Sequence, residues 1–484
     1  MISFFICLAA LTALVILDAR KKINLLHPLP LTLYLPAALN VPLLSYWFYQ
    51  LTPPALPEVL RMAFLAAPGL FVFYLWVRLN VFPFRPKKTR RPGFSATKNR
   101  LRIMMGGRFL CYAGLWAFAL EIFLLITEIV LLGKQDIPRP LFIANIVYGI
   151  LCTFFILGNG ILRIFFTSRR LSIIWRLAML MTIWIPLVNI IVLLYVCRLV
   201  YEEYDFALYR EDLHLTRADS EICKTRYPLV MVHGVLFRDL KYFNYWGRIP
   251  KELIRNGARV YYGNQEAVGT IVTNAEDLQN TIRAVLKETG VEKVNIIAHS
   301  KGGLDARYAI SRLGMEDTVA SLTTISTPHR GCRFVDKACG LPDGFYRGVA
   351  NFFDRLFRSL GDRQPDFYTA TRQFATAESE AFNRDTPDSP KVYYQSYMSK
   401  MKGSRSDLML SIPWLMIKPL EGDNDGLVSV DSAVWGEFQG VLESKSRRGI
   451  SHGDIIDLKR ADYRGFDVIE TYIGIAAALK EKGF

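Results

Sequence analysis

Histidine and paired cysteines are scarce in this chain, and acidic residues are nearly missing from its amino-terminal part. Only 6 of the 484 residues are histidine, and the 7 cysteines show no metal-binding spacing, which excludes the common zinc patterns. Residues 1–204 hold 7 Asp and Glu against 21 Lys and Arg, so +14 of the formal net charge of +15 lies there. The remainder is close to neutral, which argues against a nucleic-acid partner.

Apolar residues are abundant instead, at 51% of the chain with a mean hydropathy of +0.19, and the excess lies before Tyr204. Six stretches there are long enough to cross a bilayer, near residues 2–18, 29–50, 60–81, 109–132, 141–162 and 177–200. The first lacks a basic leader and an Ala-x-Ala cleavage site, so we interpret it as an uncleaved span rather than a signal peptide. The sequence thus predicts an all-α transmembrane domain of about six helices over residues 1–204, with a linker at 205–226.

Basic and charge-poor connections alternate between these stretches. Lys and Arg cluster after the first, third and fifth stretches, whereas the other connections carry little charge or are acidic. Short cytoplasmic loops are the ones that concentrate Lys and Arg. We therefore expect a multi-pass protein of the plasma membrane, bacterial inner membrane in type, whose region after Tyr204 faces away from the cytoplasm.

Two carboxylates lie within the fourth predicted span. Glu121 and Glu128 are seven residues apart and so share roughly one helix face, where a partner inside the bundle is expected. Arg78, Asn159 and Asn189 are candidate partners. Packing between helices is the favoured interpretation, and a lipid or ion path is the alternative.

The cysteines outside the predicted spans are Cys223, Cys332 and Cys339. An oxidising exterior permits a bridge between Cys332 and Cys339. A helical segment would hold these two sulfurs nearly two turns apart, beyond the reach of a disulfide. We therefore favour free thiols, with the bridge as the alternative.

From residue 227 onward, short apolar strands alternate with amphipathic helices, which is typical of a mostly parallel sheet covered on both faces. The apolar run at 294–298 leads directly into a helix, and the pentapeptide Ala-His-Ser-Lys-Gly at 298–302 stands at the turn. Such a G-x-S-x-G-like turn, here with alanine first, exposes the serine hydroxyl. Ser300 is therefore a candidate nucleophile, and an ordinary Ser-Gly loop is the alternative.

A serine hydroxyl needs a base that takes its proton and a carboxylate that orients the base. Elimination among the few histidines leaves His452, because it follows all the strands that we can place. The acid should fall between Ser300 and His452 in the chain order of such hydrolases. Asp423 and Asp425 both qualify, just after a predicted strand at 414–420.

At this point the residues resemble the bacterial triacylglycerol lipases of the α/β-hydrolase superfamily. The motifs of that family stand here as His233-Gly234, residues 298–303, residues 327–331, residues 424–428, and His452 followed by Asp454. They occur in order over residues 227–484, more than half of the chain. The six predicted spans lie outside the resemblance.

The resemblance implies an α/β-hydrolase domain over 227–484 and assigns roles to single residues. It implies Ser300 as nucleophile, Asp425 rather than Asp423 as acid, and His452 as base. It also implies oxyanion donors from the backbone N–H groups of Val235 and Lys301. The surrounding elbow and oxyanion loop would comprise His233, Gly234, His299, Gly302 and Gly303.

Calcium is the one metal that the resemblance raises, and no cofactor is otherwise required. Asp454 matches one family ligand and Asp407 is a conceivable second, whereas Leu458 stands where the family has an amide ligand. A helix-capping or solvated Asp454 is the alternative.

An aromatic-rich insertion at about 340–380 separates the serine from the acid. Its apolar residues recur at helical spacing, so we expect an amphipathic lid that moves to admit a lipid chain, with plain core as the alternative.

Together these features predict a membrane-anchored serine hydrolase that cleaves acyl esters of lipids through an acyl-enzyme on Ser300. A lipid acyltransferase that uses the same acyl-enzyme is one alternative. A non-catalytic membrane scaffold or transporter with a hydrolase-like domain is another.

Overall fold

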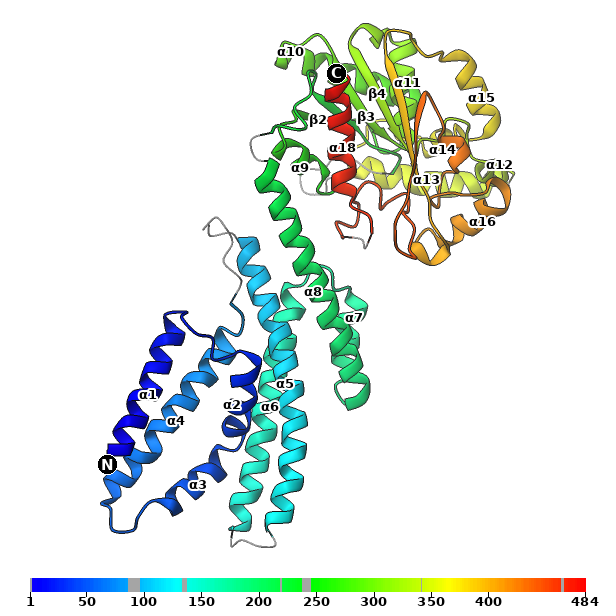
Figure 1. Cartoon of the computed structure of the whole chain (residues 1–484). Helices are drawn as coiled ribbons and strands as arrows, with labels where there is room; N and C mark the ends of the chain where they lie inside the picture. Colours follow the sequence, from blue (N-terminus) through cyan, green and yellow to red (C-terminus); the bar gives the residue numbers. More distant parts are fainter. Residues whose placement is uncertain are drawn as a thin grey trace. The chain divides into compact units, whose positions relative to one another are not determined.

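The chain folds as two units, Met1–Glu211 and Asp212–Phe484 (Figure 1). The computed structural model describes residues 2–85, 96–132, 137–217, 220–236, 245–340, 342–462 and 465–484.

The first unit is helical. Its helices are α1 (Ile2–Ala19), α2 (Pro28–Leu39), α3 (Val41–Leu51), α4 (Glu58–Val81), α5 (Ala96–Leu132), α6 (Arg139–Thr167), α7 (Ile173–Met181) and α8 (Pro186–Arg217), the last of which continues into the second unit. Part of the expected linker, residues 205–217, is therefore helical.

Two helical segments among the described residues are long and apolar enough to cross a membrane. They are Lys98–Thr127 in α5 and Arg139–Thr167, and the pair α2 and α3, bent by 81°, makes a third if it is taken as one span. Leu8–Ala19 and Pro68–Val81 are apolar but shorter. The structure thus supports two or three of the six predicted spans. The stretch at 177–200 is divided, because α7 ends at Met181 and α8 begins at Pro186.

The donor to Glu121 differs from the three candidate partners. Asn40, at the bend between α2 and α3, donates its amide to Oε1 of Glu121 over 3.0 Å. Arg78 instead pairs with Asp18. The two candidate asparagines bond elsewhere, Asn159 to Asn80 and Asn189 to Thr182. The side chain of Glu128 lies outside the described part of the structure.

The second unit is built on a six-stranded sheet. Its strands are β1 (Leu229–Val232), β2 (Val260–Tyr262), β3 (Val294–His299), β4 (Val319–Ile325), β5 (Tyr393–Ser399) and β6 (Glu437–Leu442), in the order β2-β1-β3-β4-β5-β6. Every pairing is parallel, so the carboxyl ends of all six strands meet at one edge.

Helices cover both faces of this sheet. Helices α9 (Ile249–Arg255) and α18 (Val468–Glu481) pack on one face, and α10 (Ile271–Thr289) and α11 (Lys301–Arg312) pack on the other. The other helices of this unit are α12 (Arg333–Cys339), α13 (Asp343–Ser359), α14 (Phe367–Arg372), α15 (Thr376–Asp385), α16 (Ser411–Glu421) and α17 (Val430–Ala433).

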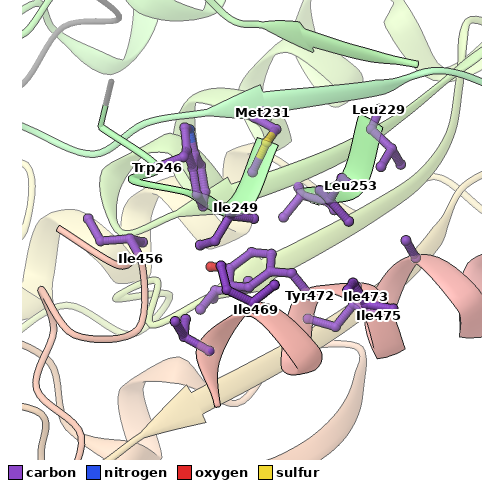
Figure 2. Packing of buried hydrophobic residues seen from close by; sticks show 14 of the residues in the cluster. Leu229, Met231, Trp246, Ile249, Leu253, Ile456, Ile469, Tyr472, Ile473 and Ile475 are labelled. Atoms are coloured by element: carbon purple, nitrogen blue, oxygen red, sulfur yellow. The ribbon is translucent and has the colours of Figure 1, made fainter. Parts of the chain in front are cut away.

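Alternating side chains of β1 reach two separate cores. Leu229 and Met231 pack with α9 and α18, where Tyr472 and Trp246 are fully buried (Figure 2). Val230 and Val232 face the opposite side and pack with α10 and α11. Both faces of the strand are therefore dry, which explains its uninterrupted apolar sequence.

One predicted strand is wrong. Residues 414–420 belong to helix α16, which ends at Glu421 before Gly422 in a positive-φ conformation (φ 77°). A short apolar run does not distinguish a strand from a helix. This helix is also only partly buried, because Ile417 alone among its residues is buried whereas Ile412 and Leu415 are exposed.

The expected lid region contains α13, α14 and the start of α15. Helix α13 is amphipathic: Ala350 and Phe357 are buried, whereas Phe345 and Phe352 are about two-thirds exposed, at 65% and 64%. The helical spacing is confirmed, and the motion that a lid requires stays a prediction. Both Cys332 and Cys339 are free thiols, and α12 separates them as the helical interpretation requires.

Candidate active site

Ser300 lies at the sharp turn between β3 and α11. Its backbone has φ 55° and ψ −131°, a conformation that residues other than glycine rarely adopt. The turn is held by the hydrogen bond from the Ser300 N–H to the carbonyl of Ile325 on β4, at 3.0 Å. Ser300 thus follows the carboxyl end of β3, where the sequence pattern predicts the nucleophile of such a turn. The residue is buried at 8% exposure, so the expectation of an exposed hydroxyl is wrong for this structure.

Glycine is required on either side of this turn because backbones pass so closely. A Cβ on Gly302 would lie 2.5 Å from the carbonyl oxygen of His233. A Cβ on Gly234 would lie 2.9 Å from the Cβ of Ser300. The His-Gly pair after β1 and the Gly-Gly pair after Ser300 therefore pack closely against each other. Gly303 packs in the same way against Thr327.

His452 and Asp425 form a buried pair. Nδ1 of the imidazole lies 2.8 Å from Oδ2 of the carboxylate, and the His452 N–H also donates to the Asp425 carbonyl at 2.9 Å. The other carboxylate oxygen accepts from the backbone N–H groups of Leu427 and Val428, at 3.1 and 2.9 Å. Asp425 is 0% exposed, and the three hydrogen bonds to its carboxylate fix the side chain in position.

Asp423 has a different environment, although it is only two residues away. It is 48% exposed and pairs with Lys418 and Lys400. The hydrogen bond from Lys418, followed by that from Lys400, holds the pKa of Asp423 below its ordinary value. Its contacts are those of a surface ion pair, and none joins it to His452.

His299 connects the base to the fold, a role that the sequence did not indicate. Its ring lies 4.4 Å from the His452 ring, centroid to centroid, and its Nδ1 shares a hydrogen bond of 2.6 Å with the Tyr245 hydroxyl. Burial, and then the proximity of His452, lowers the pKa of His299 well below its ordinary value. A neutral His299 therefore supports the imidazole of His452 without adding a second positive charge.

Two backbone N–H groups adjoin the serine. Lys301 is the first residue of α11, where an N–H has no acceptor within the helix. Val235 follows directly after the close approach of Gly234 to Ser300. Both residues are therefore next to Ser300 in the chain or next to a residue that contacts it, and their role as oxyanion donors stays a prediction.

The Lys301 side chain is turned away from the turn and into the protein. Its ammonium lies 2.6 Å from Asp305, one helical turn later, and both side chains are 1% exposed. Asn274 on α10 donates to the other carboxylate oxygen of Asp305, at 3.3 Å. The ion pair lies within the first turns of α11, and the hydrogen bond from Asn274 joins it to α10.

Both candidate calcium ligands, Asp407 and Asp454, contact cationic side chains in the structure. Asp407 accepts from the ammonium of Lys459, and Asp454 accepts two hydrogen bonds from the guanidinium of Arg448, at 2.7 and 3.0 Å. Calcium needs six to eight oxygen ligands, whereas here the carboxylates already face two cationic side chains. Among the described residues no group of three or more His, Cys, Asp or Glu is arranged to hold a metal ion.

These charges support the loop that carries His452. Ser451, one residue before it, donates its hydroxyl to Asp407 at 2.8 Å, and its N–H donates to Asp454 at 3.2 Å. Lys459 and Arg448 are the only sequence signals for this cluster. In the sequence alone they cannot be told from ordinary surface charges.

Comparison with known proteins supports the same fold. Residues 227–409 match the family described as alpha/beta hydrolase fold. Triacylglycerol lipase 2 of Saccharomyces cerevisiae is 31% identical over 271 residues, which cover 51% of this chain and 78% of the yeast protein. A triacylglycerol lipase of Pseudarthrobacter phenanthrenivorans is 36% identical over 177 residues, covering 34% of this chain and 54% of the bacterial protein, about half its length.

A solved structure, the mature form of Bacillus licheniformis lipase BlEst2, has 20% identity and a TM-score of 0.38, and the match covers 52% of this chain and 91% of that one. The yeast relative, at 31% identity over most of its length, shows the family. The chain therefore belongs to the triacylglycerol lipase family with the alpha/beta hydrolase fold, and it is a carboxylic ester hydrolase.

Proposed function

We propose that this protein is a membrane-anchored lipase in which Ser300, His452 and Asp425 act as the catalytic triad. The observation that carries the proposal is the buried hydrogen bond from His452 to Asp425. The imidazole of His452 also lies against His299, the residue that precedes Ser300. This arrangement matches the chain order of serine hydrolases with this fold.

The geometry supports an acyl-enzyme mechanism. His452 takes the proton of the Ser300 hydroxyl as the oxygen attacks the ester carbonyl, and Asp425 stabilises the imidazolium that forms. The N–H groups of Val235 and Lys301 stabilise the developing oxyanion. His452 then passes the proton to the leaving alcohol, and a water molecule activated by the same imidazole releases the acid.

The proposed substrate is a lipid ester, because the relatives are triacylglycerol lipases and because the chain carries apolar helices. Two segments of the first unit are long enough to span a membrane. Anchoring would keep the second unit close to lipid substrate, and the alternation of basic and charge-poor loops favours the extracytoplasmic side for it.

The test is a Ser300→Ala variant of the full chain in detergent or nanodiscs. It should lose essentially all hydrolysis of a long-chain acylglycerol and all labelling by a fluorophosphonate probe, while its thermal unfolding stays close to wild type. Ser326→Ala is a matched control, because this buried serine also follows a strand in a positive-φ conformation. Retention of most activity in Ser300→Ala would refute the assignment.

A further inference from the structure

A cavity of about 320 Å³ lies within the helical unit. Helices α5 and α6 and the segment from the end of α7 into α8 supply its walls. Its lining is mostly aliphatic and aromatic, with Glu121, Asn145, Thr153 and Asn189 as the polar members. The volume is at the lower end of the range of about 300–1,000 Å³ that ligand pockets have.

Two of the polar members, Asn145 and Thr153, lie on α6, and Glu121 contacts the same face of this helix from α5. Asn145, Gly149 and Thr153 follow one another at intervals of four, so they lie on the same helix face. Gly149 leaves room for the Glu121 carboxylate, because a Cβ there would lie 2.9 Å from Oε2 of Glu121. Asn40 joins this group by donating to Glu121 at 3.0 Å and accepting from Asn145 at 2.6 Å.

Thr153 supplies the second observation. Its side chain is 95% buried, at 5% exposure, yet its hydroxyl has no hydrogen-bond partner among the described residues. A buried hydroxyl without a partner is unfavourable in an apolar setting. Thr153 lines the cavity, so a ligand group in the cavity is a natural partner for it.

The lining also restricts the charge of the ligand. No Lys or Arg is among the residues that line the cavity, whereas Glu121 is. A fatty acid or phosphate head group would place a second negative charge beside this carboxylate, and the described lining holds no Lys or Arg that could contact such a head group. A hydroxyl can donate to Glu121 and accept from Thr153 at the same time.

From the unpaired Thr153 hydroxyl, the Glu121 carboxylate and the apolar walls, we propose that this cavity binds one molecule of an uncharged single-chain lipid with a hydroxylated head, the chemistry of a monoacylglycerol. The head lies among Glu121, Asn145 and Thr153. The chain follows the apolar lining formed by residues such as Phe118, Leu157 and Ile161. The site is separate from Ser300 and does not depend on the proposed catalytic roles.

The test uses a photoactivatable monoacylglycerol with a diazirine in its acyl chain and an alkyne tag. The full chain, in phosphatidylcholine nanodiscs, is irradiated and the labelled peptides are identified by mass spectrometry. We expect labelling in α5 and α6. Unlabelled monoacylglycerol should compete, and a fatty acid of the same chain length should not. Equal competition by the fatty acid, or labelling spread evenly over all apolar helices, would overturn the proposal.

Cavity variants make the test specific. Gly158 lines the cavity and a Cβ there meets nothing within 4 Å, so Gly158→Leu should fill the space and abolish the labelling without a clash. Gly69 on α4 is equally open but lies outside the lining, so Gly69→Leu should label normally. Labelling that persists in Gly158→Leu would refute the site.

The hydroxyl is tested by Thr153→Val, which we expect to weaken competition by monoacylglycerol about fivefold. Thr127→Val is the matched control, because Thr127 on α5 is exposed and bonds only to its own helix. Fluorophosphonate labelling at Ser300 should be unchanged in every cavity variant. In Ser300→Ala, in turn, the cavity should still label, which separates failure of this site from failure of the proposed triad.

Discussion

Lys459 places its ammonium against Asp407 beneath the loop that carries His452. The same ammonium lies 3.7 Å from Asp454. Although burial opposes the effect, the hydrogen bonds from Lys459 and Ser451 hold the pKa of Asp407 below its ordinary value. An internal side chain thus supplies the positive charge that these two carboxylates need.

Hydrolysis should therefore be independent of calcium. We expect the same activity and unfolding midpoint in excess EDTA as in millimolar calcium. Lys459→Gln should destabilise the protein by about 1–2 kcal/mol, a value reduced by the partial exposure of this lysine. Lys418→Gln, which removes an exposed ion pair with Asp423, should change stability by less than about 1 kcal/mol. A calcium-dependent rise in the wild-type midpoint would contradict this interpretation.

Asp425→Asn should lower the turnover number by about 10⁴, because the amide no longer fixes the imidazole of His452 in the required tautomer. Asp423→Asn should retain nearly full turnover, because this side chain contacts only Lys418 and Lys400. Steady-state kinetics on a soluble short-chain ester distinguish the two. A larger loss in Asp423→Asn would show that the acid was assigned to the wrong carboxylate.

Stability should fall as the pH drops from 7 to 5.5. Burial is the main cause that lowers the pKa of both His299 and His329, so the folded state leaves them neutral while the unfolded chain binds protons below about pH 6.5. Each such histidine contributes a loss of up to about 1.4 kcal/mol per pH unit below that value. His329→Gln should reduce the slope of unfolding free energy against pH. An unchanged slope in this variant would show that His329 is not one of the groups responsible.

Helix α13 should matter for lipid substrate but not for soluble ester. Phe352 is 64% exposed on this helix, so Phe352→Asp should leave the fold intact. We expect hydrolysis of emulsified long-chain acylglycerol to fall at least severalfold, because the charged side chain opposes contact with lipid. Turnover of a water-soluble butyrate ester should change little. Equal losses on both substrates would indicate damage to the site rather than to a lipid-contacting helix.

Sidedness can be tested with a membrane-impermeant thiol reagent on intact cells. Lys251→Cys on α9, an exposed position, should be labelled without lysis in a Cys339→Ser background, since the other described cysteines are buried. Lys88→Cys, in a basic segment outside the described residues, should be labelled only after lysis. The reverse pattern would place the hydrolase unit in the cytoplasm.

The turn at Ser300 was predictable because its unusual backbone conformation and its close contacts with neighbouring strands both restrict which residues can stand there. Ser300 needs a positive φ and glycine neighbours, and those demands leave a recognisable short motif. His452 emerged by elimination, since histidines are few. Asp425 was separated from Asp423 by family resemblance alone, and burial supplies the physical reason for the difference.

Contacts between charged or aromatic residues that are far apart in the sequence have no short motif that would identify them. The bond from Tyr245 to His299 and the cluster around Lys459 join segments that only folding brings together. The apolar run 414–420 was misassigned because a run this short fits a strand or a helix equally well, and helix α16 also exposes Ile412 and Leu415. In the first unit, hydropathy located apolar stretches, whereas the break between Met181 and Pro186 was not evident from it.

Helix α18 covers the first strand of the sheet, because Tyr472 and Ile473 pack in one core with Leu229 and Met231 (Figure 2). During translation, β1 must therefore wait for almost the whole hydrolase unit to leave the ribosome before that face is covered. Asp425 and His452 are also synthesised late, long after Ser300. The helical unit precedes the hydrolase unit in the chain, so its apolar helices leave the ribosome before Ser300, Asp425 and His452 can come together.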